Sequence, residues 1–251
     1  DTDLSQGVKN LPWSPVFSSL PAGRPSATRN SLPEAYDMRT AGPGGTSLLT
    51  PVKNQGSCGS CWAFSSLGSV ESTWKLKGYG DYDLSENNIK NCHGFLAAPC
   101  GYGSNFHPTA MFARGEGPMY EADDPYSTTN GTCVTGLTPA ALVTQVLYVP
   151  PSVEAIKETI YHHGGVSMPM RIAGSYYMDY DNYTHFNSLT TSTNHLISLV
   201  GWDDNMKVSG GTISGRPPAG VFIAKNSYGT AWGDNGFFYI SYYDLQILDY
   251  G

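Results

Sequence analysis

The fold is decided by residues 55–64, which read QGSCGSCWAF. After Cys61, apolar side chains recur at about the spacing of one helix face, at Trp62, Leu67, Val70 and Trp74. The small residues Gly59 and Ser60, just before Cys61, suit a turn and a helix cap. The pattern therefore predicts a buried helix with Cys61 in its first turn.

Cys61 is the predicted nucleophile of this stretch. The unpaired backbone N–H groups at a helix N-terminus, together with the helix dipole, favour an anion there. With a nearby imidazolium they lower the pKa of a thiol from about 8.5 to roughly 3.5–7.5. A thiolate that can attack a carbonyl carbon is then expected at neutral pH. A buried structural cysteine, the commoner role of an isolated Cys, is the alternative.

Two later stretches point the same way as residues 55–64. Residues 194–202 read NHLISLVGW, and residues 225–236 read KNSYGTAWGDNG. Together with Gln55, six positions before Cys61, they resemble the active-site motifs of the papain family of cysteine peptidases. The resemblance runs from about Leu32 to near the C-terminus, and its combined features look most like secreted prokaryotic members.

The resemblance implies a set of four catalytic residues. Cys61 attacks the carbonyl carbon, and His195 takes the thiol proton and later gives it to the leaving amine. Asn226 orients the imidazole of His195. Gln55 and the Cys61 N–H form an oxyanion hole. Read alone, a histidine in an apolar strand is more often a core residue and a glutamine in a loop is more often solvated. The resemblance favours the catalytic reading for both.

The chain departs from the family at two aromatic positions. Relatives carry Trp where Tyr228 stands, so the hydroxyl of Tyr228 needs a partner or water. Activity is expected to be retained with an altered pH profile. Tyr102 stands where relatives have a glycine. One interpretation is that its side chain narrows or caps the substrate groove, and the other is that it only packs on its own loop as a lid. Gly103 keeps the position whose backbone pairs with an extended substrate in the family.

By position in the family, substrate contacts are expected from residues that are mostly small or neutral: Gly103, Ser104, Asn105, Pro169, Thr193, Asn194 and Trp232. We therefore expect the enzyme to accept substrates with an apolar side chain two residues before the scissile bond. No insertion is visible that would close one end of the groove, which favours an endopeptidase acting on proteins or peptides. The alternative is a catalytically silent binding or surface protein on the same fold.

Composition argues against several other classes of partner. The net charge is −7 with no basic run, which disfavours nucleic acid and anionic membranes. No apolar run approaches the ~18 residues of a membrane span. No metal or cofactor is expected. The pair Asp123-Asp124 reads as a solvated turn, and the pair His162-His163 reads as an exposed helix end.

The five cysteines leave one unpaired if the other four form disulfides. Four cysteines allow about three pairings, and the sequence alone does not choose among them. The resemblance implies Cys58–Cys100 and Cys92–Cys133, with Cys61 free. Two disulfides indicate an oxidising compartment, so a secreted or cell-surface protein is expected.

The resemblance and the segregation of helical and strand patterns predict an α+β, papain-like fold with two lobes. Residues 1–31 are interpreted as an N-terminal extension or pro-segment remnant in which Trp13, Val16 and Phe17 pack against the body. A flexible tail or linker is the alternative, and whether the segment lies in or near the cleft is left open. A form held inactive by this segment is a further alternative. Residues 32–138 are the mostly helical lobe that carries the nucleophile. Residues 139–251 are a β-barrel-like lobe that carries His195 and Asn226, with the active-site cleft between the lobes.

Element positions follow from capping and periodicity. A short helix capped by Ser85 is expected over residues 84–92, a weak one over 107–117, and a third over 152–163 that ends at Gly164. Strands are expected over 166–172, 196–202, 221–225 and 237–243.

Overall fold

The computed structural model describes residues 32–209 and 216–248, and the described residues from Pro33 onward belong to one compact unit. The predicted extension at residues 1–31 lies outside the described residues. The elements in chain order are β1 (Ala35–Asp37), η1 (Pro43–Gly45), α1 (Cys61–Leu76), α2 (Glu86–Cys92), α3 (Phe106–Ala113), α4 (Val153–His163), β2 (Val166–Met170), η2 (Gly174–Tyr176), β3 (Met178–Asp179), β4 (Thr184–His185), β5 (His195–Asp203), β6 (Val221–Lys225), β7 (Phe237–Ser241) and α5 (Leu245–Leu248).

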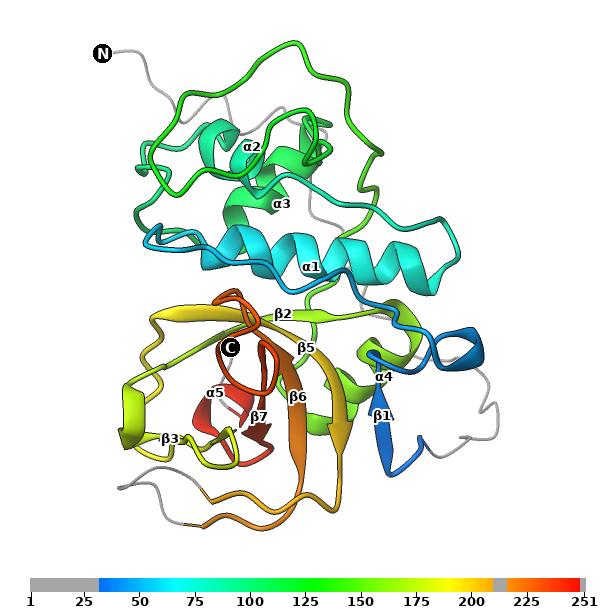
Figure 1. Cartoon of the computed structure of the whole chain (residues 1–251), viewed down its shortest axis with the longest axis vertical. Coiled ribbons are helices and arrows are strands. Elements are labelled where there is room, and N and C mark those ends of the chain that lie inside the picture. The colour runs from blue at the N-terminus through cyan, green and yellow to red at the C-terminus, as the bar shows by residue number, and fades with distance from the viewer. Residues whose placement is uncertain (1–31, 210–215, 249–251) are drawn as a thin grey trace, which may run out of the picture. The chain divides into compact units, whose positions relative to one another are not determined.

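Helices α1, α2 and α3 enclose one apolar core. Its buried members are Trp62, Ala63, Leu67, Leu84, Ile89, Met111 and Phe112. Val70 and Trp74 pack against this core, so the helix face predicted from the sequence is confirmed. Figure 1 shows α1 lying between the other two helices and the sheet. Cys61 is the first residue of α1.

The helix cap predicted at Ser85 is confirmed, and the one predicted at Ser60 is wrong. The Ser85 hydroxyl accepts a hydrogen bond from the Asn88 N–H at 2.9 Å, and Ser152 starts α4 in the same way. Ser60 occupies the cap position of α1, but its side chain makes no capping bond. Its hydroxyl instead lies 2.7 Å from the hydroxyl of Tyr126, a partner 66 positions away that no local pattern reveals.

The sheet has seven strands in the order β1-β5-β6-β7-β4-β3, with β2 pairing to β5. The predicted strands correspond to β2, β5, β6 and β7. The expected β-barrel-like closure is not found. In the described part of the chain, the outer strands β1 and β3 do not pair, so the sheet is open. Strands β3 and β4, at the edge away from β1, are each only two residues long.

Helix α1 lies directly on strand β5 because the residues at their contact are small. A Cβ on Gly68 would lie 2.9 Å from the Ser198 hydroxyl oxygen. Two hydroxyl bonds fix the contact. Ser65 donates to the Ile197 carbonyl at 2.6 Å, and Ser198 donates to the Ser65 carbonyl at 3.0 Å. This packing holds the start of α1 near the start of β5.

Strand β1 differs from the predicted division of the chain. It falls within residues 32–138, which were assigned to the helical lobe, yet it pairs antiparallel with β5. The Trp202 indole N–H also donates to the Pro33 carbonyl at 3.0 Å. The beginning of the described chain therefore belongs to the sheet, and only the helices of that range gather beside it (Figure 1).

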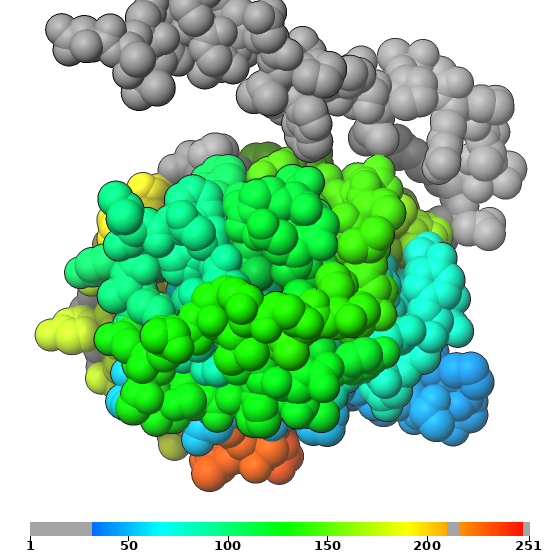
Figure 2. All heavy atoms as spheres, turned by 90° about the horizontal axis from the view of Figure 1, so that it is seen from above, coloured from blue at the N-terminus to red at the C-terminus, as the bar shows by residue number. Residues whose placement is uncertain are grey.

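The segment between α3 and α4 crosses the outside of the helical half. Figure 2 shows it, in green, over much of one face of the molecule. A disulfide holds it there by joining Cys133 to Cys92 at the end of α2. Within the segment, the Ala140 N–H donates to the Pro118 carbonyl at 2.8 Å.

Candidate active site

The turn before α1 fixes the position of Cys61. The second disulfide, Cys58–Cys100, closes this turn onto a neighbouring loop. Gly59 lies against that loop so closely that a Cβ would be 2.9 Å from the carbonyl oxygens of Cys100 and Gly101. A larger residue would push the turn away, so this glycine is required by packing. Cys61, the remaining cysteine, is free and buried.

Burial dominates the ionisation of Cys61. It raises the pKa of the thiol, although the backbone N–H groups of Leu196, Trp62 and Cys61 itself act in the opposite direction. Desolvation of the thiolate thus opposes the lowering expected from the helix amides, and the imidazolium that completes this expectation comes from His195. The contact with the Leu196 amide places the sulfur beside the residue that follows His195.

His195 is the first residue of β5, and Asn226 fixes its tautomer. The Nε2–H of His195 donates to Asn226 Oδ1 at 2.8 Å in a buried contact. Asn226 Oδ1 also accepts the Ser227 backbone N–H at 2.8 Å, which identifies this atom as the oxygen. Nδ1 is therefore the nitrogen that carries the lone pair. Burial lowers the pKa of His195 to about 4, against the opposing effect of the Asn226 hydrogen bond.

The side chain of Gln55 is held by hydrogen bonds to the turn before α1 and to the loop after β6. Its Nε2 donates to the Cys58 carbonyl at 2.8 Å, and its Oε1 accepts the Ser227 hydroxyl at 2.6 Å. The amide has two N–H donors, so the second can point toward an oxyanion. Its backbone carbonyl accepts the hydroxyl of Tyr126 at 2.9 Å.

Two positioning residues were missed by the sequence analysis. Ser227 bonds both Gln55 and Asn226, and Tyr126 joins Gln55 to Ser60. The signal for Ser227 was its place directly after Asn226. Tyr126 gave only the weak signal of a Pro-Tyr turn, because the partners of its hydroxyl lie far away in sequence.

Aromatic rings cover the imidazole. The Tyr228 ring lies over His195 with a centroid distance of 4.8 Å and an interplanar angle of 32°. Trp232 packs against Tyr228 edge to face, with its centroid at 5.6 Å. The Tyr228 hydroxyl lies 3.3 Å from His195 Nδ1, so its partner is the imidazole itself.

The predicted substrate contacts fall into separate groups. Ser104 and Asn105 line a cavity of about 480 Å³, together with Met168. Pro169, Thr193 and Asn194 are not among its lining residues. Asn105 is also engaged, because its Oδ1 accepts the hydroxyls of Ser66 at 3.2 Å and Ser167 at 2.8 Å.

The backbone at Gly103 runs against the indole of Trp62. A Cβ at this position would lie 2.1 Å from the indole nitrogen, so any side chain would displace either the loop or the ring. Tyr102 is almost fully exposed beside it. Exposure leaves Tyr102 outside the packed loop, so of its two readings the packed lid is wrong.

The solvated turn predicted for the acidic pair Asp123-Asp124 is correct for Asp123, which is exposed, and wrong for Asp124. Asp124 is buried, and its carboxylate accepts the side-chain amides of Asn87 at 2.6 Å and Asn88 at 3.2 Å. It thus ties the loop to α2. Within the described residues, no group of three His, Cys, Asp or Glu side chains could hold a metal ion. No helix in the same residues has the length and apolarity needed to cross a membrane.

Comparison with known proteins places these features among cysteine proteases. The family model described as papain family cysteine protease matches residues 32–246. A cysteine proteinase of Trypanosoma brucei brucei is 30% identical over 89% of this chain and 47% of its own length. Cathepsin S of Bos taurus is 30% identical over 84% of this chain and 61% of its own length. The chain spans about half the length of the curated relatives it matches.

Solved structures agree. The cysteine protease and lectin-like domains of Cwp84, a surface layer associated protein of Clostridium difficile, are similar with a TM-score of 0.77 and 29% identity, covering 88% of this chain and 50% of that one. The bromelain protease of Ananas comosus is similar with a TM-score of 0.67 and 26% identity, covering 84% of this chain and 90% of that one.

Proposed function

Because this chain belongs to the papain family of cysteine proteases, we propose that it is a cysteine endopeptidase that cleaves proteins or peptides through an acyl-enzyme. The observation that carries the proposal is the buried bond from His195 Nε2 to Asn226 Oδ1. It leaves Nδ1 as the base, on a residue next to the amide that contacts the Cys61 thiol.

The proposed reaction has two stages. The Cys61 sulfur attacks the scissile carbonyl while its proton moves to His195 Nδ1, giving a transient thiolate–imidazolium pair. The second N–H of the Gln55 amide and the backbone N–H of Cys61 stabilise the oxyanion. His195 then protonates the leaving amine, and water, activated by the same nitrogen, releases the acyl group. Burial raises the pKa of the Cys61 thiol, so the thiolate depends on the imidazolium of His195 for its stabilisation.

The protein is proposed to act outside the cell. Its two disulfides favour an oxidising compartment, and the similar protein Cwp84 is described as surface layer associated. The silent binding protein is not favoured, because Gln55, Cys61, His195 and Asn226 are all present. Inhibition by residues 1–31 stays a hypothesis.

The test is hydrolysis of a fluorogenic peptide with an apolar residue two positions before the cleaved bond. The full chain and a chain that starts at Ser31 are compared, and an epoxide that alkylates thiols reports on Cys61. Turnover by both chains, with Cys61 labelled, supports the peptidase. Turnover by the shorter chain alone assigns residues 1–31 an inhibitory role. Two inert chains with an unlabelled thiol contradict the proposal.

The acid limb of the pH profile is expected near pH 4. The imidazole must be neutral to accept the thiol proton, and burial lowers its pKa to about 4. Activity should therefore be lost as the pH falls through about 4, not through the ordinary histidine value of about 6.5. The measurement is kcat/KM against pH, which reports on the free enzyme. Samples held at each pH and assayed after return to neutrality control for unfolding, and a midpoint near pH 6.5 would contradict the buried neutral imidazole.

A further inference from the structure

The loop that carries Gly103 lies against both sides of the nucleophile. A Cβ on Gly59, two residues before Cys61, would be 2.9 Å from the Gly101 carbonyl oxygen. A Cβ on Gly103 would be 2.1 Å from the indole nitrogen of Trp62, the residue after the nucleophile. Among the described residues, neither the N–H nor the carbonyl of Gly103 has a hydrogen-bond partner. A free donor and a free acceptor on one residue suit strand-like pairing with an extended chain.

His107 holds the peptide group that joins Gly103 to Ser104. The Ser104 N–H donates to His107 Nδ1 at 3.1 Å. A backbone N–H can only donate, so Nδ1 carries the lone pair of this ring and Nε2 carries its proton. The Ser104 hydroxyl lies 3.3 Å from the same nitrogen and can donate to it as well. The Ser104 carbonyl, also 3.3 Å from Nδ1, accepts the backbone N–H of His107 instead.

This hydrogen bond also sets the direction of the Gly103 carbonyl. The peptide bond is trans and planar, so its N–H and its carbonyl point in opposite directions. Because the Ser104 N–H points toward His107, the second residue of α3, the Gly103 carbonyl points away from that helix. We propose that His107 is a positioning residue that holds the Gly103 carbonyl ready to accept an N–H of an extended substrate. This role rests on the proposed function and on the substrate contact predicted for Gly103.

Aromatic packing keeps the His107 ring in place. The ring centroid lies 5.1 Å from that of Trp62, 4.7 Å from that of Phe95 and 4.9 Å from that of His93. Trp62 is buried in the core beneath α1 and directly follows Cys61. The acceptor nitrogen is therefore fixed relative to the nucleophile, and so is the peptide group that it holds.

The same contact also has a purely structural interpretation. It resembles one half of a capping box, in which a side chain reaches back three positions to a backbone N–H and stabilises the start of a helix. The two roles predict different kinetics. Loss of a cap alone destabilises α3 and leaves binding to Gly103 intact in the folded enzyme. Loss of positioning weakens the binding of a peptide that reaches Gly103 and leaves the nucleophile itself unchanged.

The test pairs peptide hydrolysis with alkylation of Cys61 by iodoacetamide, which is too small to reach Gly103. His107→Phe keeps an aromatic ring and removes the acceptor. It should raise KM for the fluorogenic peptide by about three- to ten-fold, the range set by one neutral hydrogen bond. A change in KM with little change in kcat is the sign of lost binding that is shared by substrate and transition state. The rate of alkylation should stay at the wild-type value.

Two further variants separate the acceptor from the ring. His107→Asn has no ring, but its side-chain oxygen takes the place of Nδ1, so it should restore KM toward the wild-type value. His93→Phe is the matched control. His93 Nδ1 accepts the Phe95 N–H at 3.0 Å, so this variant removes a like acceptor from the same aromatic group without touching the Gly103 peptide. Its KM should be that of wild type.

An unchanged KM in His107→Phe, or a KM raised more in His107→Asn than in His107→Phe, would overturn the positioning role and leave the proposed function standing. Equal losses in turnover and in alkylation would assign His107 to the stability of α3 alone. If wild type hydrolyses no peptide, the proposed function fails and the positioning role fails with it. Thermal unfolding is measured for every variant, and His107→Leu, which also lacks the acceptor, replaces His107→Phe if the phenyl ring prevents folding.

Discussion

Replacement of Cys61 by alanine is expected to lower kcat/KM for peptide hydrolysis by about 10⁴- to 10⁶-fold. Without the thiol no acyl-enzyme forms, and His195 and Asn226 have no nucleophile to serve. What remains is stabilisation of the oxyanion by Gln55 and the backbone, and that acts only on direct attack by water. The loss should appear in kcat more than in KM, because alanine removes no contact predicted for the substrate.

Cys61→Ala should stay folded, because Cys61 is the free cysteine and both disulfides are intact without it. Thermal unfolding measured beside the kinetics separates lost chemistry from lost structure. Ser57→Ala, at an exposed position of the same loop, is the matched control and should keep wild-type turnover. A Cys61→Ala enzyme with a few per cent of wild-type activity would mean that another group is the nucleophile.

Local patterns predicted helices α1 to α4 and strands β2, β5, β6 and β7, because their signals lie within a few residues, and missed the short β1, β3, β4 and α5. Ser85 and Ser152 cap helices through the N–H three positions later, and strand β6 has the predicted ends. Ser60 failed where Ser85 succeeded, although both precede a helix. The hydroxyl of Ser60 meets Tyr126, a contact that only the folded chain creates.

In the candidate active site, too, the contacts that only the folded chain creates could not be predicted from the sequence. The four catalytic candidates and the two disulfide pairs were predicted through the resemblance of their motifs to the papain family, and both disulfides are present. The partner of the Tyr228 hydroxyl could not, because it depends on where two strands place a ring. Nor could the raised pKa of Cys61, since the helix position was visible in the sequence but the depth of burial was not. Hydrogen-bond partners and pKa values that depend on contacts between distant parts of the chain cannot be predicted from local sequence patterns.

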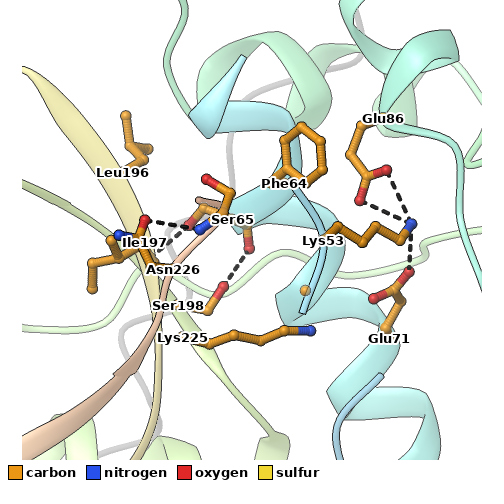
Figure 3. A pocket seen from close by; sticks show the side chains of 12 residues that line it. Lys53, Phe64, Ser65, Glu71, Glu86, Leu196, Ile197, Ser198, Lys225 and Asn226 are labelled. Carbon is orange, nitrogen blue, oxygen red and sulfur yellow. Dashed lines mark hydrogen bonds and ion pairs between the residues drawn. The ribbon is translucent and has the colours of Figure 1, made fainter. Parts of the chain in front are cut away.

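Behind the catalytic residues lies a cluster of buried charges, shown in Figure 3. Lys53 Nζ lies 3.0 Å from the Glu86 carboxylate and 3.8 Å from that of Glu71, and both carboxylates are almost fully buried. Lys225 enters the same small cavity, and its ammonium donates to the Thr50 carbonyl at 2.8 Å. The cluster joins α1, α2 and β6. Lys53 is two residues from Gln55, and Lys225 adjoins Asn226.

At about pH 9, where Glu86 is ionised, Lys53→Met is expected to lower the free energy of unfolding by about 3–5 kcal/mol, because it leaves buried carboxylates without this cation. Urea denaturation with the disulfides intact measures the change. Lys75→Met is the matched control, since Lys75 pairs with the exposed Asp81 and an exposed pair contributes only about 0–1 kcal/mol. A Lys53→Met protein within about 1 kcal/mol of wild type would show that the cluster needs no cation at this position.

The loss in Lys53→Met should also grow with pH. Burial raises the pKa of Glu86 to about 8 even with Lys53 beside it, and removing the ammonium raises it further. A carboxyl whose pKa is raised in the folded state stabilises the fold at low pH, and that contribution is lost as the pH rises through the folded pKa. The deficit against wild type should therefore be larger at about pH 9 than at about pH 6. Adding Glu86→Gln to Lys53→Met should remove most of this dependence, because glutamine keeps the shape of the protonated acid and has no charge to expose. A deficit that stays constant over this range would mean that lost packing of the lysine stem, not an unpaired charge, destabilises the variant.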